Sequence, residues 1–490
     1  MRNNNLLELK RALQEVEHRL KQFPKDISLW IKKFEVLKAL GESEEAGITL
    51  LNLEGIATDE KTKTHILQIL TEFCTDHELY LLGHTAATRL FNLVPDSGRA
   101  QFFLGKFAYR CMFYLESIRC LEAASISVPN NPSCSRFNGL SHLKIGRSDI
   151  SIDLFESSLN IDPSNTSVAI HSAMAALYAN GLNEEKVFSV HQRASHLISK
   201  DILKKGCKAF PDGKRVGIIS GDFYLHSVSF FSESLIEGLL EGGFDIFCYS
   251  VQPTSKNDMV TEKFIEMSTD WSEMSDASSE DLHQKVVEDS IDILFDLSGY
   301  MDESRPEVFQ HRAAPIQINY IGYPHTTGFS EIDYRIVDNY TDPLGLNDKF
   351  TTEKLVRLPD CFLCFKPYSE APNVSDSRFE EDGSISIRFG SFNNMAKITP
   401  EVIDTWATIL NRIPNATLLI KATPLIGKDL KERLFVDFEK HGVDRKRLTL
   451  VSWIESKRAH LELYNKIDIH LDTFPYNGTT TTCEAAWQGV

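Results

Sequence analysis

The sequence has 490 residues, of which 42% are apolar, and its formal net charge is −17, from 52 Lys and Arg against 69 Asp and Glu. Length and composition are those of an ordinary globular protein of about two to four domains. The acidic balance excludes nucleic acid and anionic membranes as main partners, because both would repel the chain.

Hydropathy and cysteine usage indicate a cytoplasmic protein. No apolar run reaches the roughly 18 residues of a transmembrane helix, and the charged N-terminal segment lacks the apolar core of a secretory signal. The nine cysteines form no regular framework, which fits reduced thiols. Cys361 and Cys364 form a CxxC pair without a second pair, so we interpret them as apolar packing residues and expect no metal site. In a eukaryote the same features would also fit a nucleocytoplasmic protein.

Residues 1–200 contain a helical repeat. Pro95, Pro129 and Pro163 recur at intervals of 34 residues, and each follows an apolar segment that a proline would end as a helix. The predicted helices are 102–110, 114–126, 135–145, 149–160, 167–180 and 184–198. Further upstream, the order of Pro24, Trp30, Leu37 and Gly41 suggests an earlier, degenerate unit. The period of 34 predicts a tetratricopeptide-like solenoid, whose concave surface would bind peptides or proteins.

A different pattern begins after the segment 204–213, which we interpret as a linker. Short apolar runs alternate with helical patterns, as in strands that are buried on both faces of a parallel sheet. The predicted strands are 215–221, 244–251, 292–299, 316–324 and 334–338, and the predicted helices are 229–241, 257–267, 279–289 and 304–311. This series predicts a doubly wound α/β domain over 210–375.

A second α/β series occupies 380–490. Its predicted strands are 386–392, 416–423, 448–454 and 468–474, and its predicted helices are 400–414, 427–441, 457–465 and 479–490. Thr399 is placed to cap the first helix and Pro400 to begin it. Two consecutive domains of this kind are typical of nucleotide-sugar transferases, with dehydrogenases and ligases as alternatives. Doubly wound sheets usually have about five or six strands, so we expect this last domain to be incomplete.

The segment 471–484, LDTFPYNGTTTTCE, is the strongest chemical motif. A strand ends in a turn at Gly478, and four threonines then open a helix. Free N–H groups and a partial positive charge at a helix N-terminus suit phosphate, and threonine hydroxyls add donors. Glu484 follows one turn inside the helix, where it could hold a ribose diol. The alternative interpretation is a helix cap with surplus threonines.

Four further residues lie at expected strand ends or beside them. Lys397, in a strand-to-helix loop, could stabilise a leaving diphosphate, or it could be a solvated surface lysine. His226 follows the first strand of the 210–375 domain and could act as a base or bind an acceptor, or it could be structural. Gly322 lies in a glycine-rich turn, and His460 lies in the helix before the last strand. No GxGxxG follows any predicted strand, which disfavours a dehydrogenase.

Together these segments resemble the catalytic region of the O-GlcNAc transferase family, most closely its SPINDLY-type branch. The resemblance covers roughly 205–490 and rests on 355–365 (LVRLPDCFLCF), 389–400 (FGSFNNMAKITP) and 471–484, preceded by the repeat array. It implies a GT-B fold and an inverting protein O-glycosyltransferase. Such an enzyme transfers a sugar from a nucleotide-sugar donor to Ser or Thr hydroxyls of proteins bound by the repeats, without a metal or other cofactor.

The resemblance also implies roles for single residues. His226 matches a histidine proposed as the catalytic base, and Lys397 matches a lysine that contacts the donor diphosphate and is needed for activity. The other donor-binding matches are Gly322 (sugar pocket), His460 (donor contact), Thr480 and Thr481 (phosphates) and Glu484 (at the position of an aspartate on the ribose in the animal enzymes).

The resemblance leaves the identity of the nucleotide-sugar donor open. Residues 479–484 read TTTTCE where the animal enzymes read HTTGMD, and this is the SPINDLY form. Its plant members use GDP-fucose, whereas many bacterial relatives are assigned UDP-GlcNAc. Because the family continues beyond the position of Val490, the competing hypothesis is a non-catalytic repeat scaffold with a degenerate or truncated transferase domain. A homodimer is one option for the oligomeric state.

Overall fold

The computed structural model describes residues 2–198, 213–374 and 386–490. They form two compact units, Met1–Ile145 with Asp153–Asp162, and Gly146–Ile152 with Pro163–Val490. The predicted linker falls outside the described residues except for Gly213, as does the expected junction at 375–380.

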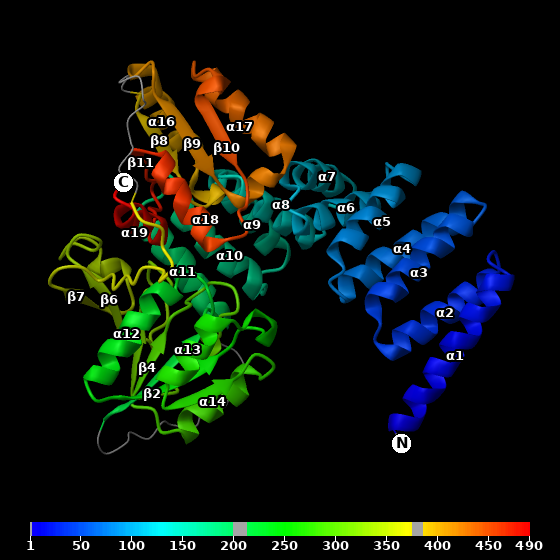
Figure 1. Cartoon of the computed structure of the whole chain (residues 1–490), viewed down its shortest axis with the longest axis horizontal. Coiled ribbons are helices and arrows are strands. Elements are labelled where there is room, and N and C mark those ends of the chain that lie inside the picture. The colour runs from blue at the N-terminus through cyan, green and yellow to red at the C-terminus, as the bar shows by residue number, and fades with distance from the viewer. Residues whose placement is uncertain (1, 199–212, 375–385) are drawn as a thin grey trace. The chain divides into compact units, whose positions relative to one another are not determined.

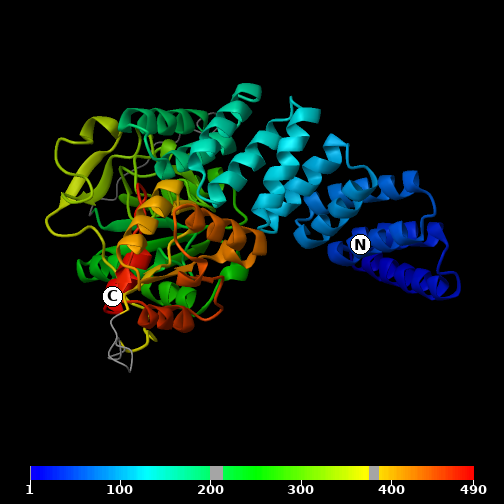
Figure 2. The same cartoon turned by 90° about the horizontal axis from the view of Figure 1, so that it is seen from above.

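The first unit consists of paired helices, shown in blue to cyan in Figure 2. They are α1 (Arg2–Gln22), α2 (Ile27–Leu40), α3 (Ser43–Ile56), α4 (Glu60–Asp76), α5 (Tyr80–Leu93), α6 (Gly98–Arg110), α7 (Tyr114–Ser127), α8 (Pro132–Lys144) and α9 (Ser148–Ile161), whose first residues belong to the second unit. The four helices predicted between 102 and 160 are confirmed.

The repeat has a physical basis in close helix packing. A Cβ on Gly105 of α6 would lie 2.5 Å from Cγ of Leu121, and a Cβ on Gly139 of α8 would lie 2.7 Å from Cε1 of Phe155. The two glycines are one repeat of 34 residues apart, and the next equivalent position is Ala173, which is fully buried. The repeat thus places a small residue at this position in α6, α8 and α10, and in α6 and α8 that residue allows the first helix of the pair to pack closely on the second.

The second unit contains a parallel sheet of seven strands in the order β3-β2-β1-β4-β5-β6-β7. Figure 1 labels four of them, β2, β4, β6 and β7. The strands are β1 (Arg215–Ser220), β2 (Asp245–Ser250), β3 (Asp270–Glu273), β4 (Ile293–Asp296), β5 (Ile316–Asn319), β6 (Tyr334–Asp338) and β7 (Lys354–Leu358). Its helices are α12 (Ser229–Glu241), α13 (Met259–Met267), α14 (Ser279–Glu288) and α15 (Pro306–Gln310). The predicted doubly wound domain is confirmed, but β3 and β7 were not predicted.

The other sheet of this unit has four parallel strands in the order β10-β9-β8-β11. The strands are β8 (Arg388–Ser391), β9 (Thr417–Lys421), β10 (Leu448–Val451) and β11 (Ile469–His470), and the helices are α16 (Pro400–Arg412), α17 (Lys428–Lys440), α18 (Lys457–Glu462) and α19 (Thr480–Trp487). As predicted, Thr399 caps α16 by accepting a hydrogen bond from Val402 N at 3.4 Å, and Pro400 begins the helix. The strand expected at 468–474 is only two residues long, so 471–478 is a loop.

The last two predicted repeat helices belong to the second unit as well. They are α10 (Thr166–Tyr178) and α11 (Glu184–Ile198). Nδ1 of His191 faces the Val187 carbonyl at 2.7 Å and must carry the hydrogen, so Nε2 accepts from the Tyr323 hydroxyl at 2.7 Å. Ser195 Oγ donates to Gly328 O at 2.8 Å. These contacts tie α11 to the loop that follows β5.

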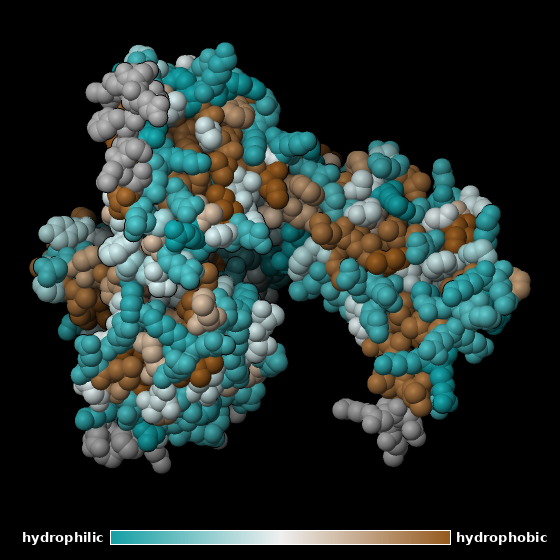
Figure 3. All heavy atoms as spheres, viewed as in Figure 1, coloured by the Kyte–Doolittle hydropathy of each residue, from teal (hydrophilic) through white to brown (hydrophobic). Residues whose placement is uncertain are grey.

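The face drawn in Figure 3 alternates between hydrophilic and hydrophobic areas. Among the helices that the structure describes, none combines the length and apolarity needed to cross a bilayer.

Candidate functional site

The loop between β11 and α19 is organised by the side chain of Asp472. Its Oδ1 accepts from Gly478 N at 2.7 Å and its Oδ2 from Asn477 Nδ2 at 3.2 Å. Thr473 Oγ1 donates to Tyr476 O at 2.9 Å. Because these bonds lie within the loop, its backbone has a defined path into α19 at the carboxyl end of the four-stranded sheet.

Lys397 follows β8, as the sequence predicts, and its side chain contacts the loop between β11 and α19. It ends a short 3₁₀ turn after β8, Met395–Lys397, and its Nζ donates to Asn477 O at 2.8 Å. The same Nζ lies 4.2 Å from the centroid of the Tyr476 ring, a cation–π distance. Burial lowers the pKa of Lys397 to about 8, and the nearby charge of Asp472 opposes that effect.

Thr480 and Thr481 are the first residues of α19, and they lie near the loop after β8 that contains Lys397. Thr481 Oγ1 donates to Asn393 Oδ1 at 2.9 Å, and Thr480 Oγ1 lies 3.5 Å from Ser227 O in the loop after β1. The residue before the helix, Thr479, makes no side-chain cap, so the first N–H groups of α19 are available to a ligand. The arrangement therefore offers an ammonium group, hydroxyls and helix N–H groups on one edge of the sheet.

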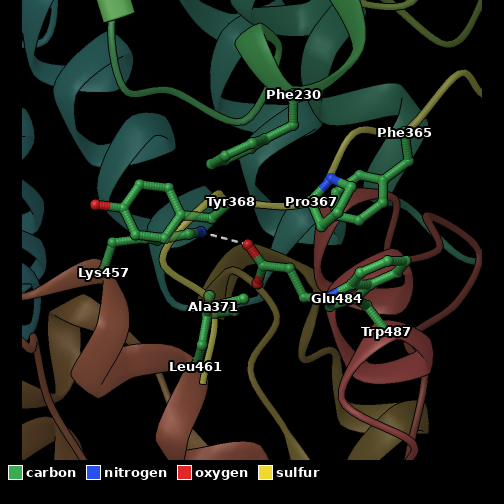
Figure 4. A pocket seen from close by; sticks show the side chains of 9 residues that line it. All are labelled: Phe230, Phe365, Pro367, Tyr368, Ala371, Lys457, Leu461, Glu484 and Trp487. Carbon is green, nitrogen blue, oxygen red and sulfur yellow. Dashed lines mark hydrogen bonds and ion pairs between the residues drawn. The ribbon is translucent and has the colours of Figure 1, made fainter. Parts of the chain in front are cut away.

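Glu484 lies at the centre of a buried cluster (Figure 4). It is 4% exposed, and its carboxylate accepts from Lys457 Nζ, from His460 Nε2 at 3.1 Å and from the Tyr464 hydroxyl at 3.2 Å. Burial alone would raise the pKa of Glu484, but the His460 hydrogen bond and the Lys457 charge bring it below its usual value. Burial lowers the pKa of His460.

This cluster lines a pocket between aromatic side chains. Figure 4 shows Glu484 and Lys457 facing one another below the ring of Phe230, with Phe365 and Trp487 beside them. Glu484 reaches the pocket while it holds its internal partners, and the pocket, with a volume of about 10 Å³, has room for roughly a single water molecule. Lys457 was not predicted as a site residue, and its only sequence signal is its place in the same short helix as His460.

His226 lies at the carboxyl edge of the seven-stranded sheet, in the loop between β1 and α12. Its Nδ1 is 3.2 Å from Asp222 Oδ1 and 3.4 Å from Val228 N. Burial lowers the pKa of His226 to about 4, as do the charges of Lys256 and Lys457, and burial raises the pKa of Asp222 to about 6. At neutral pH the imidazole is uncharged, as a general base must be. Asp222, four residues before His226, was not predicted.

Gly322 follows β5, and its close contacts are with the segment after β4. A Cβ at this position would lie 1.7 Å from Leu297 O and 3.2 Å from Ser298 N. The glycine is therefore needed for the close approach of two backbone segments. These contacts are separate from those that join Lys397 to the threonine loop.

Substituting Gly322 should test this packing requirement. We expect Gly322→Ala to lower the free energy of unfolding by about 3 kcal/mol, because backbone atoms cannot yield to the new methyl group as a side chain could. Gly238→Ala in α12 is the matched control, since its Cβ would meet nothing within 4 Å and alanine favours a helix by about 1 kcal/mol. Urea denaturation of both variants measures the difference, and equal stabilities would contradict the expectation.

Comparison with known proteins agrees with this fold and these motifs. The sequence model of Glycosyl transferase family 41 matches residues 165–367 and 377–490. The Arabidopsis thaliana protein named probable UDP-N-acetylglucosamine–peptide N-acetylglucosaminyltransferase SPINDLY is 36% identical over 336 residues, which is 67% of this chain and 36% of that protein. The Caenorhabditis elegans UDP-N-acetylglucosamine–peptide N-acetylglucosaminyltransferase is 34% identical over 391 residues, covering 56% of this chain and 33% of that protein.

A solved structure is similar over most of the chain. A lysine-to-methionine mutant of the Thermobaculum terrenum O-GlcNAc transferase superposes with a TM-score of 0.76 at 28% identity, covering 89% of this chain and 82% of that one. The chain spans only about a third of the length of these plant and nematode relatives. The family model nevertheless matches well over half of the chain, which confirms the resemblance found in the sequence: the protein belongs to glycosyl transferase family 41.

Proposed function

We propose that the protein transfers a sugar from a nucleoside diphosphate sugar to Ser or Thr hydroxyls of protein acceptors, with inversion at the anomeric carbon. The observation that carries the proposal is the convergence of Lys397, Thr480 and Thr481 at the N-terminus of α19. These are donors suited to a diphosphate. The relatives' names, which specify peptide N-acetylglucosaminyl transfer, support a protein acceptor.

In this mechanism the nucleoside diphosphate gains negative charge as the bond to the sugar breaks. Lys397 meets this charge with its ammonium group, while the threonine hydroxyls and the N–H groups of α19 donate hydrogen bonds to the phosphate oxygens. A donor aimed at developing charge contributes about 3 kcal/mol to the transition state. The bond from Lys397 to Asn477 O keeps the ammonium group in place before the donor binds.

The acceptor hydroxyl must lose its proton as it attacks the anomeric carbon. His226 is the proposed base: with its hydrogen on Nδ1, which faces Asp222 Oδ1 at 3.2 Å, its Nε2 makes no hydrogen bond to any described residue and can take up the proton. After proton transfer, the Asp222 carboxylate would stabilise the imidazolium ion, as a buried carboxylate does in other acid–base sites. The repeat helices would present the acceptor protein.

Two donors, UDP-GlcNAc and GDP-fucose, are consistent with the proposal, and the deciding experiment compares them directly. The chain is incubated with each radiolabelled donor and a protein extract, while calorimetry measures binding of UDP and of GDP. We expect transfer from one donor and tighter binding of the matching nucleotide. If neither sugar is transferred and neither nucleotide binds, the enzyme proposal is wrong and the chain is a scaffold.

The pH dependence should report the protonation of Lys397. Burial sets its pKa at about 8, and the charged form is the active one, so kcat/KM should fall as the pH rises above about 8. Lys397→Arg is the informative variant, because a guanidinium stays charged. We expect it to be slower at pH 7 but to show no fall up to pH 10 or so. An unchanged upper limb in the arginine variant would assign that limb to another group.

A further inference from the structure

Tyr178, the last residue of helix α10, contacts the loop of the proposed leaving-group site. Its ring is parallel to that of Tyr476, with centroids 4.7 Å apart and planes at 10°. Tyr178 is 8% exposed, so its own position is fixed by packing. Nζ of Lys397 lies 4.2 Å from the centroid of the same Tyr476 ring. One aromatic ring therefore contacts both a repeat helix and the proposed catalytic lysine.

The backbone that follows Lys397 is also held from the repeat side. Asn180 Nδ2, two residues after Tyr178, donates to Thr399 Oγ1 at 3.1 Å. Gly146 packs so closely on the carbonyl of Ile398 that a Cβ there would lie 2.1 Å from its oxygen. The repeat segments of the second unit thus contact both the loop after β8, which contains Lys397, and the loop 471–479, which leads into α19.

A lysine side chain needs such restraint to act at a defined point. It is a flexible stem with a point charge, and an ammonium group displaced by about 1 Å can cost a hundredfold in rate. Besides its contact with the ring of Tyr476, the Nζ of Lys397 donates a hydrogen bond to the carbonyl of Asn477 at 2.8 Å. Both anchors lie on the same loop, so whatever fixes that loop fixes the ammonium group.

We infer that Tyr178 is a positioning residue for the transfer reaction, which holds Lys397 in place through the ring of Tyr476. The expected effect on kcat rests on the proposed function, whereas the expected effect on the position and pKa of Lys397 does not. Without the Tyr178 ring, Tyr476 loses its parallel partner and water reaches its exposed face. Lys397 then samples other rotamers, and its ammonium group becomes better solvated.

The test uses three substitutions at one position and a matched control. Tyr178→Phe keeps the stacked ring, Tyr178→Leu keeps bulk without aromatic stacking, and Tyr178→Ala removes both. Tyr114→Ala in α7 is the control, since Tyr114 is 7% exposed in a helix of the same kind but in the other unit. Thermal unfolding of each variant shows which of them fold, and the leucine variant serves if the alanine variant does not.

Two measurements separate positioning from general destabilisation. Competitive labelling with an amine-reactive reagent, read by peptide mass spectrometry, gives the pKa of Lys397 without any need for activity. The titratable groups around this amine are Asp472, Tyr476 and Tyr178. We expect the pKa of Lys397 to rise from about 8 towards the ordinary lysine value in the leucine and alanine variants. It should stay unchanged in the phenylalanine variant and in Tyr114→Ala.

The kinetic measurement compares kcat and the donor KM. We expect kcat to fall at least tenfold in Tyr178→Leu, with a smaller change in KM and full activity in Tyr178→Phe. The inference is overturned if Lys397 titrates as in the wild type in both the leucine and alanine variants, or if Tyr114→Ala reproduces their loss. If the wild-type chain transfers no sugar, the proposed function fails while the labelling experiment still decides on the role of Tyr178.

Discussion

Replacing Lys397 with methionine should lower kcat by about a hundredfold to a thousandfold, the range found when one donor to a developing charge is removed. Methionine keeps most of the apolar stem, but the ammonium group is lost, and with it the cation–π contact with the Tyr476 ring at 4.2 Å and the hydrogen bond to Asn477 O at 2.8 Å. The removed cation was partly buried, and its loss leaves only a backbone carbonyl unsatisfied. We therefore expect the folded state to be retained, with the defect confined to turnover and diphosphate binding.

Lys440→Met is the matched control, because the Lys440 side chain is 66% exposed on α17. It should change turnover by less than twofold or so, as surface substitutions usually do. Calorimetry of UDP and GDP supplies a second reading, in which Lys397→Met binds the preferred nucleotide at least about tenfold more weakly. Transfer within threefold or so of the wild type would show that another group stabilises the leaving diphosphate.

Glu484→Gln should lower the free energy of unfolding of the second unit by about 3 to 5 kcal/mol, the cost of removing one partner from a buried ion pair. The substitution keeps the shape of the side chain but leaves Lys457 and His460 without the carboxylate that they share. Tryptophan fluorescence in urea measures the change, because Trp271, Trp406, Trp453 and Trp487 lie in the second unit and only Trp30 in the first.

Glu462→Gln on α18 is the control, since its pair with Arg458 is about half exposed and contributes little. The pKa of Glu484 is lowered in the folded protein, on balance, by its partners. The stability it contributes is therefore present above its unfolded pKa and is lost as the pH falls through its folded pKa. The wild type should lose this part of its stability in acid, whereas Glu484→Gln should show a flatter dependence there. If the free energy of unfolding depends on pH in the same way in both proteins, the loss of stability in acid comes from groups other than Glu484.

In the seven-stranded sheet, the sequence predicted the five inner strands and missed the two at the edges. β3 reads DWSE and β7 reads KLVRL, so neither contains the continuous apolar run of a central strand. Their exposed positions tolerate charge, and only pairing with β2 and β6 identifies them. The length of β11 was overestimated because Leu471 and Phe474 continue the apolar pattern into the loop that follows it.

For the candidate site, the sequence located Lys397 and the threonines but not the residues around them. A strand-to-helix loop in a parallel sheet lies at the ligand-binding edge wherever it occurs, so the place of Lys397 follows from local pattern. The stacking of Tyr178 on Tyr476 joins positions far apart in the chain and leaves no periodic signal. Likewise, the three partners of Glu484 become visible only when α18 and α19 are packed together.

Because α10 and α11 belong to the second unit, they determine where a fragment that contains this unit should begin. The match to family 41 begins at residue 165, one residue before α10. The repeat helices before Gly146 supply neither partner in the contacts of His191 with Tyr323 and of Tyr178 with Tyr476. A fragment that begins at 210, where the α/β pattern starts, would lack His191 and Tyr178, which are the partners of Tyr323 and Tyr476. Because Gly146–Ile152 also belong to the second unit and Gly146 packs on Ile398 O, a fragment that keeps this unit intact should begin before Gly146, inside the repeat pattern.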